Sequence, residues 1–334
     1  MRTLKLRRYY LDRPGESPWT RLRHRLTRRP IPSFPRTLQI QTLTGCNADC
    51  VFCPYGSTYP AQPKGRMAPE LFERILEEAA RHRVRRISPY LMNEPLLDKD
   101  LCGKIRTIRR RVPGCKVVLT SNGHYLTPEV AEMLLDLGED LHEIYVSVQG
   151  IDKPAYEATM RGSMNFDRTL SHVHHFIEAQ RRRGAGRPKL WITMVDTGMI
   201  DARKAIAYWQ SQGVAAKYTT LENRGGNIKD ADAYSRTHRM SCYDACQRLF
   251  KQGYILFNGD MVLCCADYGR EQVLGNITSR SIDEVWNGPV ACDIRRRYID
   301  REFAGLPLCG RCKIDEMREV SVDVDGREIV QAVE

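Results

Sequence analysis

Residues 46–53 read Cys46-Asn-Ala-Asp-Cys50-Val-Phe-Cys53, and they follow an apolar run at residues 37–43, Thr-Leu-Gln-Ile-Gln-Thr-Leu. The run predicts a β-strand, so the three cysteines fall in a loop after it. Three thiolates on one short loop can bind three irons of a [4Fe–4S] cluster, which leaves the fourth iron without a protein ligand. A zinc loop is the alternative, although zinc sites prefer pairs of C-x2-C. The spacing therefore favours a cluster that can bind a ligand from outside the protein.

The chain repeats a strand-and-helix pattern six times from residue 37 onwards. Apolar or β-branched runs lie at residues 37–43, 84–91, 116–121, 143–149, 189–195 and 215–221. The stretches between them have helical periodicity, and one of them begins with Pro128 after Thr127, a typical N-cap followed by a first-turn proline. Six such units predict an α/β fold with a parallel sheet, either doubly wound or curved into a partial barrel. In both arrangements, ligands collect at the carboxyl ends of the strands.

Composition and charge restrict the class of protein. No apolar run reaches 18 residues and no signal-peptide core is present, so we expect no membrane span. Twelve cysteines without a secretion signal indicate a reducing, cytoplasmic location and metal ligands. The net charge is +11, and residues 1–36 carry eleven Lys and Arg against two acidic residues, or +9 of it. We expect this extension to pack on the barrel and not to bind nucleic acid, because no RNA-binding motif accompanies the charge. The packing contacts that we expect are Tyr9, Tyr10, Leu11 and Trp19.

The C-x3-C-x2-C spacing, with Phe52 before the third cysteine, resembles the radical S-adenosylmethionine (radical SAM) superfamily. The resemblance selects a partial (β/α)6 TIM-like barrel and implies that SAM chelates the open iron of the cluster bound by Cys46, Cys50 and Cys53. Four segments at later strand ends also resemble family motifs, and they imply SAM-binding roles for Glu94, Asn122, Ser147 and Arg161, together with Phe52.

Glu94 lies in Met92-Asn-Glu-Pro95, where the family has Gly-Gly-Glu-Pro, and a carboxylate there can accept hydrogen bonds from the SAM amino group. Asn122 lies in a Thr-Ser-Asn-Gly sequence that resembles the turn near the SAM ribose, although Asn-Gly is also typical of a simple turn. The resemblance implies that Ser147 faces the same pocket and that Arg161 pairs with the methionyl carboxylate.

After residue 240 the sequence becomes dense in cysteine. Asn258-Gly259 predicts a two-residue hairpin turn, and residues 281–287 and 290–303 predict helices. Four further cysteines have the spacing C-x17-C-x44-C-x2-C, which suits a fully ligated cluster or a four-thiolate zinc site. These cysteines are Cys246, Cys264, Cys309 and Cys312.

This region resembles the SPASM/twitch extensions of radical SAM enzymes in their one-cluster form, and in particular that of the 2-deoxy-scyllo-inosamine dehydrogenases of aminoglycoside biosynthesis. The resemblance implies an auxiliary [4Fe–4S] cluster, with Cys242 or Cys265 able to replace one of the four ligands. We therefore predict a basic extension (1–36), a radical SAM barrel (37–235), a twitch/SPASM domain (236–320) and a C-terminal tail (321–334).

The resemblance also implies a chemistry in which a 5′-deoxyadenosyl radical removes hydrogen from an unactivated carbon. An external one-electron reductant, such as flavodoxin or ferredoxin, is the implied partner. We expect a small polar substrate of antibiotic biosynthesis, a sugar, aminocyclitol or nucleoside sugar, and we favour dehydrogenation of a carbinol over epimerisation. For epimerisation, Cys292 is the candidate hydrogen donor, although a packing role is the alternative. Arg224 is the candidate contact to a polar or anionic substrate.

Two other radical reactions remain as alternatives, a decarboxylation of a sugar acid such as cytosylglucuronate and the modification of a peptide or protein. Only 45 residues precede Cys46, too few for the leader-recognition domain of many peptide maturases. The chain also has cysteines for one auxiliary cluster, whereas sulfatase-maturing relatives use two. Both features favour a small-molecule substrate.

Overall fold

The computed structural model of the chain describes residues 9–10, 17–27, 29–228, 230–234, 239–241, 246–315, 318–322 and 328–332. Cys242 and most of the basic extension before residue 17 lie outside the described residues. None of the described helices is long and apolar enough to cross a membrane.

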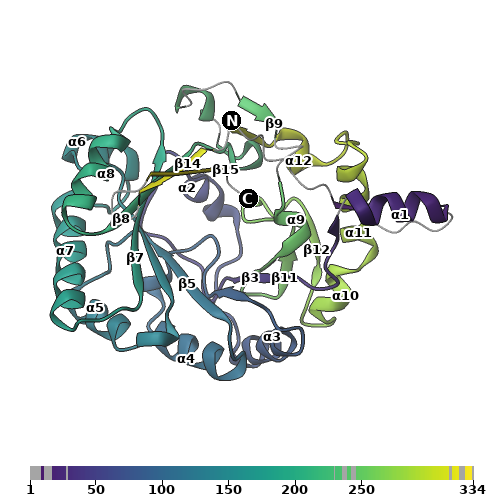
Figure 1. Ribbon diagram of the computed structural model, residues 1–334, viewed down its shortest axis with the longest axis horizontal. Helices are drawn as coiled ribbons and strands as arrows, with labels where there is room; N and C mark the ends of the chain where they lie inside the picture. The colour runs from purple at the N-terminus through teal and green to yellow at the C-terminus, as the bar shows by residue number, and fades with distance from the viewer. Residues whose placement is uncertain are drawn as a thin grey trace.

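Six parallel strands form the wall of a partial barrel, in the order in which they occur in the chain (Figure 1). They are β3 (Thr37–Ile40), β4 (Arg86–Ser88), β5 (Lys116–Ser121), β6 (Glu143–Ser147), β7 (Lys189–Asp196) and β8 (Ala215–Thr220). Helices cover the outside of this wall, namely α3 (Pro69–Arg81), α4 (Leu101–Arg111), α5 (Pro128–Leu135), α6 (Lys153–Met160), α7 (Phe166–Arg182) and α8 (Ala202–Ser211). The predicted partial (β/α)6 barrel is confirmed.

Aliphatic side chains on the strands account for the core. Leu38, Ile144 and Val146 are completely buried, and each such side chain contributes about 1.5–3 kcal/mol to folding. The helix predicted after Thr127 is also present as α5. Thr127 caps its N-terminus, since the Thr127 side chain accepts a hydrogen bond from the Val130 N–H at 3.4 Å.

The C-terminal cysteine-rich region extends the same sheet beyond β3. Strand β10 (Gln252–Ile255) pairs in parallel with β3, and β11 (Asp260–Val262) and β12 (Val273–Asn276) follow in antiparallel order. Its helices are α9 (Arg248–Lys251), α10 (Ile282–Trp286), α11 (Pro289–Ile299) and α12 (Pro307–Arg311). Strand β13 (Lys313–Asp315) pairs with β9 (Arg239–Ser241) in a small separate sheet.

The hairpin between β10 and β11 corrects one prediction. Leu256 and Asp260 close it through a hydrogen bond of 2.8 Å, so the loop has three residues, 257–259, and not two. Gly259 has φ +87°, whereas Asn258 does not have the positive φ that a two-residue Asn-Gly turn requires. The loop is therefore a tight turn that ends in a left-handed glycine.

A C-terminal hairpin covers the other edge of the barrel. Strand β14 (Arg318–Val322) pairs antiparallel with β8, and β15 (Glu328–Ala332) pairs with β14 (Figure 1). Strand β14 thus runs through residue 320, where we predicted the twitch domain to end. The domain boundaries themselves stay predictions.

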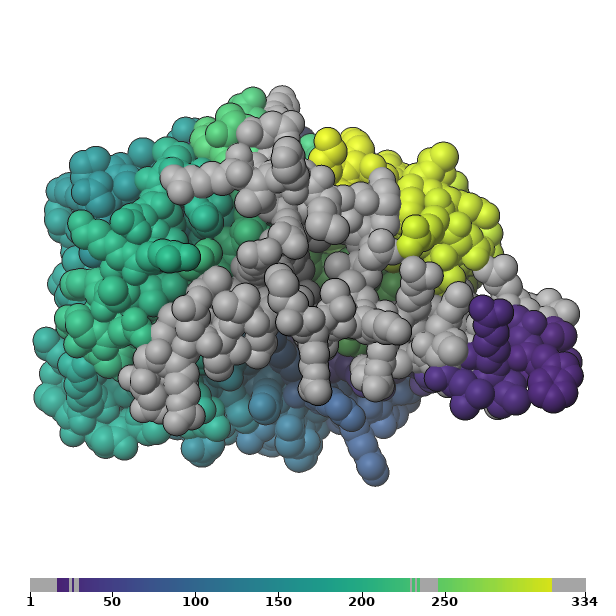
Figure 2. Space-filling view, turned by 45° about the horizontal axis from the view of Figure 1, so that its top comes forward, coloured from purple at the N-terminus to yellow at the C-terminus, as the bar shows by residue number. Residues whose placement is uncertain are grey.

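The described part of the N-terminal extension stands away from the barrel. Helix α1 (Pro18–Thr27) projects from the body of the protein (Figures 1 and 2), and β1 (Tyr9–Tyr10) pairs with β2 (Arg29–Pro30). Trp19 is 80% exposed, so the expectation that it packs on the barrel is wrong. The linker after β2 does pack, because the Trp286 Nε1–H donates to the Pro32 carbonyl at 2.9 Å.

Candidate active site

A cavity of about 320 Å³ lies at the carboxyl ends of the barrel strands. We call it the strand-end cavity. The barrel contributes all three cysteines of the C-x3-C-x2-C loop, and the region after β8 contributes three further side chains. The side chains that concern its chemistry are Cys46, Cys50, Phe52, Cys53, Tyr90, Glu94, Asn122, Ser147, Arg224, Cys265 and Tyr268.

The cysteine loop is held in place by the last turn of α6 and by the residues that follow it. The Val51 N–H donates to the Thr159 carbonyl at 3.0 Å, and the Ser163 N–H donates to the Asn47 carbonyl at 2.9 Å. Gly162 has φ +69°, and a Cβ atom there would lie 2.7 Å from the Asn47 carbonyl oxygen. Only glycine therefore allows this close approach, which fixes the position of the three thiols.

The three thiols lie close enough to affect each other electrostatically. Burial raises the pKa of Cys46 to about 12, and the neighbouring Glu94 and Cys53 also raise it. Burial, Cys53 and Cys46 all raise the pKa of Cys50. Such thiols lose their protons only when a cation compensates the charge, as iron does.

Among the described residues, no three His, Cys, Asp or Glu side chains come close enough together to hold one metal ion. A cluster at these three thiols is therefore favoured over a single zinc ion by the C-x3-C-x2-C spacing, because zinc sites prefer pairs of C-x2-C.

Glu94 is almost completely buried between the ends of β4 and β5. Its carboxylate accepts hydrogen bonds from the Ser121 hydroxyl at 2.7 Å, the Asn122 N–H at 2.8 Å and the Leu96 N–H at 3.0 Å. Burial raises the pKa of Glu94 to about 7, although these three donors oppose the shift. The Glu94 N–H also donates to the Gly45 carbonyl at 2.8 Å, which joins the carboxylate to the cysteine loop.

Asn122 and Ser147 occupy the strand ends predicted for them. The Asn122 Nδ2 group donates to Asn47 Oδ1 at 2.8 Å and lies 4.0 Å from Cys46 Sγ. Ser147 ends β6, and its hydroxyl accepts a hydrogen bond from the buried Gln149 side chain at 3.0 Å. Both residues line the strand-end cavity.

Arg161 is the one predicted SAM-binding residue that does not line the cavity. It caps α6 with φ +49°, its side chain is exposed, and its Nε–H donates to the Ala158 carbonyl at 3.2 Å. In the Arg161-Gly162 pair, the glycine rather than the arginine contacts the cysteine loop.

The second set of thiols gathers behind the cavity. Burial and the neighbouring Cys246 and Cys312 raise the pKa of Cys309. The pKa of Cys264 is raised by burial, by Cys265 and by Cys246. The Ala266 N–H points at Cys264 Sγ at 3.3 Å, a donor that suits a bound thiolate. These interactions place Cys246 near Cys264, Cys309 and Cys312.

Cys265 and Cys292 differ in position. Cys292 lies on α11, does not line the strand-end cavity, and its thiol donates to the Asn287 carbonyl at 3.3 Å. Cys265 does line the cavity and makes no hydrogen bond with any residue in the described ranges. The sequence pointed to Cys292 as hydrogen donor, and the only signal for Cys265 is its place directly after Cys264, in a turn that the Asp267 N–H closes on the Cys264 carbonyl at 3.1 Å.

A buried glutamate and two partly buried arginines form a charged group beside the cavity. Arg248 holds Glu222 with two hydrogen bonds, of 2.5 and 2.7 Å, while Arg224 Nη1 lies 3.9 Å from the same carboxylate. Burial alone would raise the pKa of Glu222, but Arg248 and Arg224 lower it to about 2. Arg224 is therefore the less tightly paired cation, and it is the one that lines the cavity.

The backbone at Arg224 is strained. Arg224 has φ +51° and the next residue, Gly225, has φ +67°. A Cβ atom on Gly225 would lie 2.3 Å from the Leu308 side chain. Packing against α12 thus determines where the Arg224 side chain enters the cavity.

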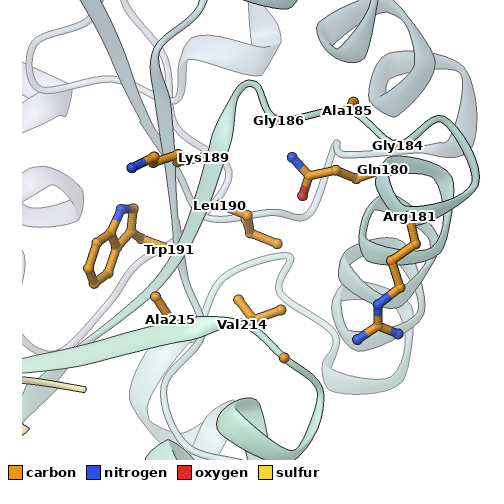
Figure 3. A pocket seen from close by; sticks show the side chains of 11 residues that line it. Gln180, Arg181, Gly184, Ala185, Gly186, Lys189, Leu190, Trp191, Val214 and Ala215 are labelled. Carbon is orange, nitrogen blue, oxygen red and sulfur yellow. The ribbon is translucent and has the colours of Figure 1, made fainter. Parts of the chain in front are cut away.

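Another cavity, of about 470 Å³, lies at the opposite ends of β7 and β8. Figure 3 shows Lys189 and Trp191 of β7 on one side of it and Gln180 and Arg181 of α7 on the other. It includes none of the predicted site residues. Because catalytic residues of such barrels lie at the carboxyl ends of the strands, it is not the candidate active site.

The barrel with its two sets of thiols defines an iron–sulfur protein with an additional C-terminal iron–sulfur domain. Residues 40–195 match the radical SAM superfamily, and residues 246–313 match the SPASM iron–sulfur cluster-binding domain. Residues 40–195 therefore carry a radical SAM domain, as the sequence predicted. The cofactors of the protein are SAM, a [4Fe–4S] cluster and an auxiliary cluster, and the two sets of thiols, most of them partly buried, fit these groups.

Three matches, one by sequence and two by structure, illustrate the similarity. The chain is 21% identical to the S-adenosyl-L-methionine-dependent 2-deoxy-scyllo-inosamine dehydrogenase of Niallia circulans, over 82% of this chain and 91% of that protein. The structure of BtrN in complex with AdoMet and 2-DOIA matches with a TM-score of 0.58 and 17% identity, over 83% of this chain and 92% of that one. Streptococcus suis SuiB bound to the precursor peptide SuiA matches with a TM-score of 0.62 and 17% identity, over 86% and 74% of the two chains. Both structural matches show a common fold.

Proposed function

We propose that this protein oxidises a secondary alcohol of a small polar substrate, an aminocyclitol, sugar or nucleoside sugar of antibiotic biosynthesis. The observation that supports this proposal is the composition of the strand-end cavity, where the cysteine loop and Glu94 face Arg224 and Cys265. The similarity to an aminocyclitol dehydrogenase over most of both chains supports the same substrate class.

The residues have separate roles in this proposal. Cys46, Cys50 and Cys53 would hold the cluster. Glu94, Asn122, Ser147 and Phe52, which line the same cavity, would bind SAM. When they are bound, the cluster and SAM supply a 5′-deoxyadenosyl radical that removes a hydrogen atom from the carbinol carbon. Loss of one electron and one proton then gives the ketone. Cys246, Cys264, Cys309 and Cys312 would hold the auxiliary cluster, which supplies an electron acceptor next to the cavity.

Arg224 binds the substrate in this proposal. A guanidinium group can donate several hydrogen bonds in a fixed plane, which suits the hydroxyl groups of a cyclitol or a carboxylate. Because Arg248 already satisfies Glu222 at 2.5 and 2.7 Å, Arg224 has donors left for a ligand.

The test is product analysis after anaerobic reaction with SAM, a reductant and candidate aminocyclitols or sugars. Oxidation predicts a product lighter by two hydrogens and one 5′-deoxyadenosine per turnover. Alanine at Cys46, Cys50 or Cys53 should abolish 5′-deoxyadenosine, whereas Cys292→Ala should not. Unchanged 5′-deoxyadenosine formation in the three loop variants would contradict the proposal, and so would a product that has lost CO2.

The position of the Cys265 thiol in the strand-end cavity supports a second candidate reaction, epimerisation. After removal of a hydrogen atom from the substrate carbon, the Cys265 thiol would give a hydrogen atom back to that carbon. The resulting sulfur radical would then take up one electron from the external reductant and one proton from solvent. In D2O the product would then keep its mass apart from one deuterium, and Cys265→Ala would abolish the deuterium uptake while Cys292→Ala would not. A ketone without deuterium uptake would exclude this reaction.

A further inference from the structure

The two domains meet at a contact between a tyrosine and a cysteine. The Tyr268 hydroxyl lies 3.5 Å from Cys53 Sγ, although the two residues are 215 positions apart in the chain. Cys53 belongs to the loop after β3, and Tyr268 follows Cys264 in the C-terminal region. Both side chains line the strand-end cavity.

The loop that carries Tyr268 is held firmly. Asp267 is completely buried, and its carboxylate accepts hydrogen bonds from the Glu271 N–H at 2.8 Å and the Gln272 N–H at 3.0 Å. The Tyr268 N–H donates to the Ala266 carbonyl at 2.9 Å. These contacts hold the backbone from which the phenol ring reaches Cys53.

The direction of this hydrogen bond follows from the chemistry of iron binding. A cysteine binds iron as a thiolate, which has no proton to donate. In the loaded protein the hydroxyl must therefore be the donor and the sulfur the acceptor. Tyr268 Oη makes no other hydrogen bond with a residue that the structure describes, so this sulfur is the acceptor available to it.

We propose that the Tyr268 hydroxyl donates a hydrogen bond to the Cys53 thiolate and thereby raises the reduction potential of the SAM-binding cluster. Reduction adds negative charge to the cluster, and a hydrogen bond to a ligating sulfur stabilises that charge. Tyr268 is thus a positioning residue through which the C-terminal domain makes the first cluster easier to reduce. The inference rests on the proposed assignment of Cys53 as an iron ligand.

The test is a redox titration of the anaerobic holoenzyme followed by electron paramagnetic resonance. The SAM-binding cluster is identified by the change of its signal on addition of SAM, since only a cluster with an open iron responds. Tyr268→Phe should shift its midpoint potential to a more negative value. Tyr90→Phe is the matched control, because Tyr90 lines the same cavity but its hydroxyl lies 2.6 Å from the Thr120 hydroxyl instead.

A second measurement does not depend on the potential. In D2O the reduced wild-type cluster should show coupling to an exchangeable deuteron in electron–nuclear double resonance, and Tyr268→Phe should lose it while Tyr90→Phe keeps it. Equal potentials and equal spectra in wild type and Tyr268→Phe would overturn the proposal. If Tyr268→Phe cannot retain iron, absence of this coupling in the SAM-bound wild type would overturn it. A preparation with no signal that responds to SAM contradicts the ligand assignment of Cys53 instead.

Discussion

Replacement of Glu94 by glutamine tests the candidate SAM site most directly. Burial raises the pKa of the Glu94 carboxyl from 4.5 to about 7. Its ionisation therefore lowers the free energy of unfolding by about 3 kcal/mol as the pH rises through that interval. This loss of stability is complete above pH 7 and absent below pH 4.5, because the raised pKa means that the folded protein disfavours the ionised carboxylate. A cation bound next to the carboxylate would reverse that preference. The amino group of SAM would be such a cation.

The expected effect can be worked out from these values. About a tenth of the carboxyl is ionised at pH 6 and about three quarters at pH 7.5, so its contribution to SAM affinity should grow about eightfold over this range. Glu94→Gln removes the charge and places an amide NH2 group opposite the Asn122 N–H, which now donates to the carboxylate at 2.8 Å. Loss of a charge-assisted hydrogen bond weakens binding by about 1.5–3 kcal/mol, roughly 10- to 150-fold in Kd at pH 7.5.

The assay is anaerobic equilibrium dialysis of radiolabelled SAM with the cluster-loaded protein between pH 6 and 7.5. The ratio of the Glu94→Gln Kd to the wild-type Kd should rise about eightfold over that interval, since any titration of SAM itself cancels in the ratio. Glu143→Gln is the control for loss of a carboxylate. Glu143 lies at the end of β6 away from the strand-end cavity, and its carboxylate accepts a hydrogen bond from Tyr145. A ratio that does not change with pH would refute the reasoning.

Three further predictions concern the framework of the site. Gly162→Ala should destabilise the protein more than Gly184→Ala and lower its iron content, because both glycines have positive φ but only Gly162 has backbone atoms within 3 Å of the new Cβ; equal thermal midpoints and equal iron would contradict this. Arg248→Met should cost about 3–5 kcal/mol by leaving Glu222 buried beside a weaker partner, and Glu222→Gln in the same chain should restore part of it; additive losses in denaturation would contradict the pairing. Cys309→Ser should lower iron from about eight to about four per chain while the SAM-responsive resonance signal remains, and unchanged iron would remove Cys309 from the ligand set.

The sequence was most informative where a short pattern has one physical meaning. The alternation of apolar runs predicted the six parallel strands, and the cysteine spacings predicted both sets of thiols. Glu94, Asn122 and Ser147 could be placed because each follows a strand, and the carboxyl ends of parallel strands meet at one edge. Arg161 follows a helix and not a strand, and its side chain is exposed, so its role in SAM binding stays a prediction.

What the sequence left out depends on contacts between distant segments. Nothing in the order of residues indicates that Tyr268 approaches Cys53, since the approach depends on how the C-terminal domain packs against the barrel. The choice between Cys265 and Cys292 likewise depends on which face of a segment meets the cavity. Such contacts become visible only when both domains are placed in three dimensions.

The two strand pairings at the ends of the barrel have a consequence for the synthesis of the protein. Strand β10 covers the β3 edge and β14 covers the β8 edge, so both covering strands leave the ribosome after all six barrel strands. The nascent barrel therefore has two unprotected edges, which are templates for association with other chains. Overproduction should give inclusion bodies when translation stalls before β10, and slower translation or a bound chaperone should improve the yield of native protein.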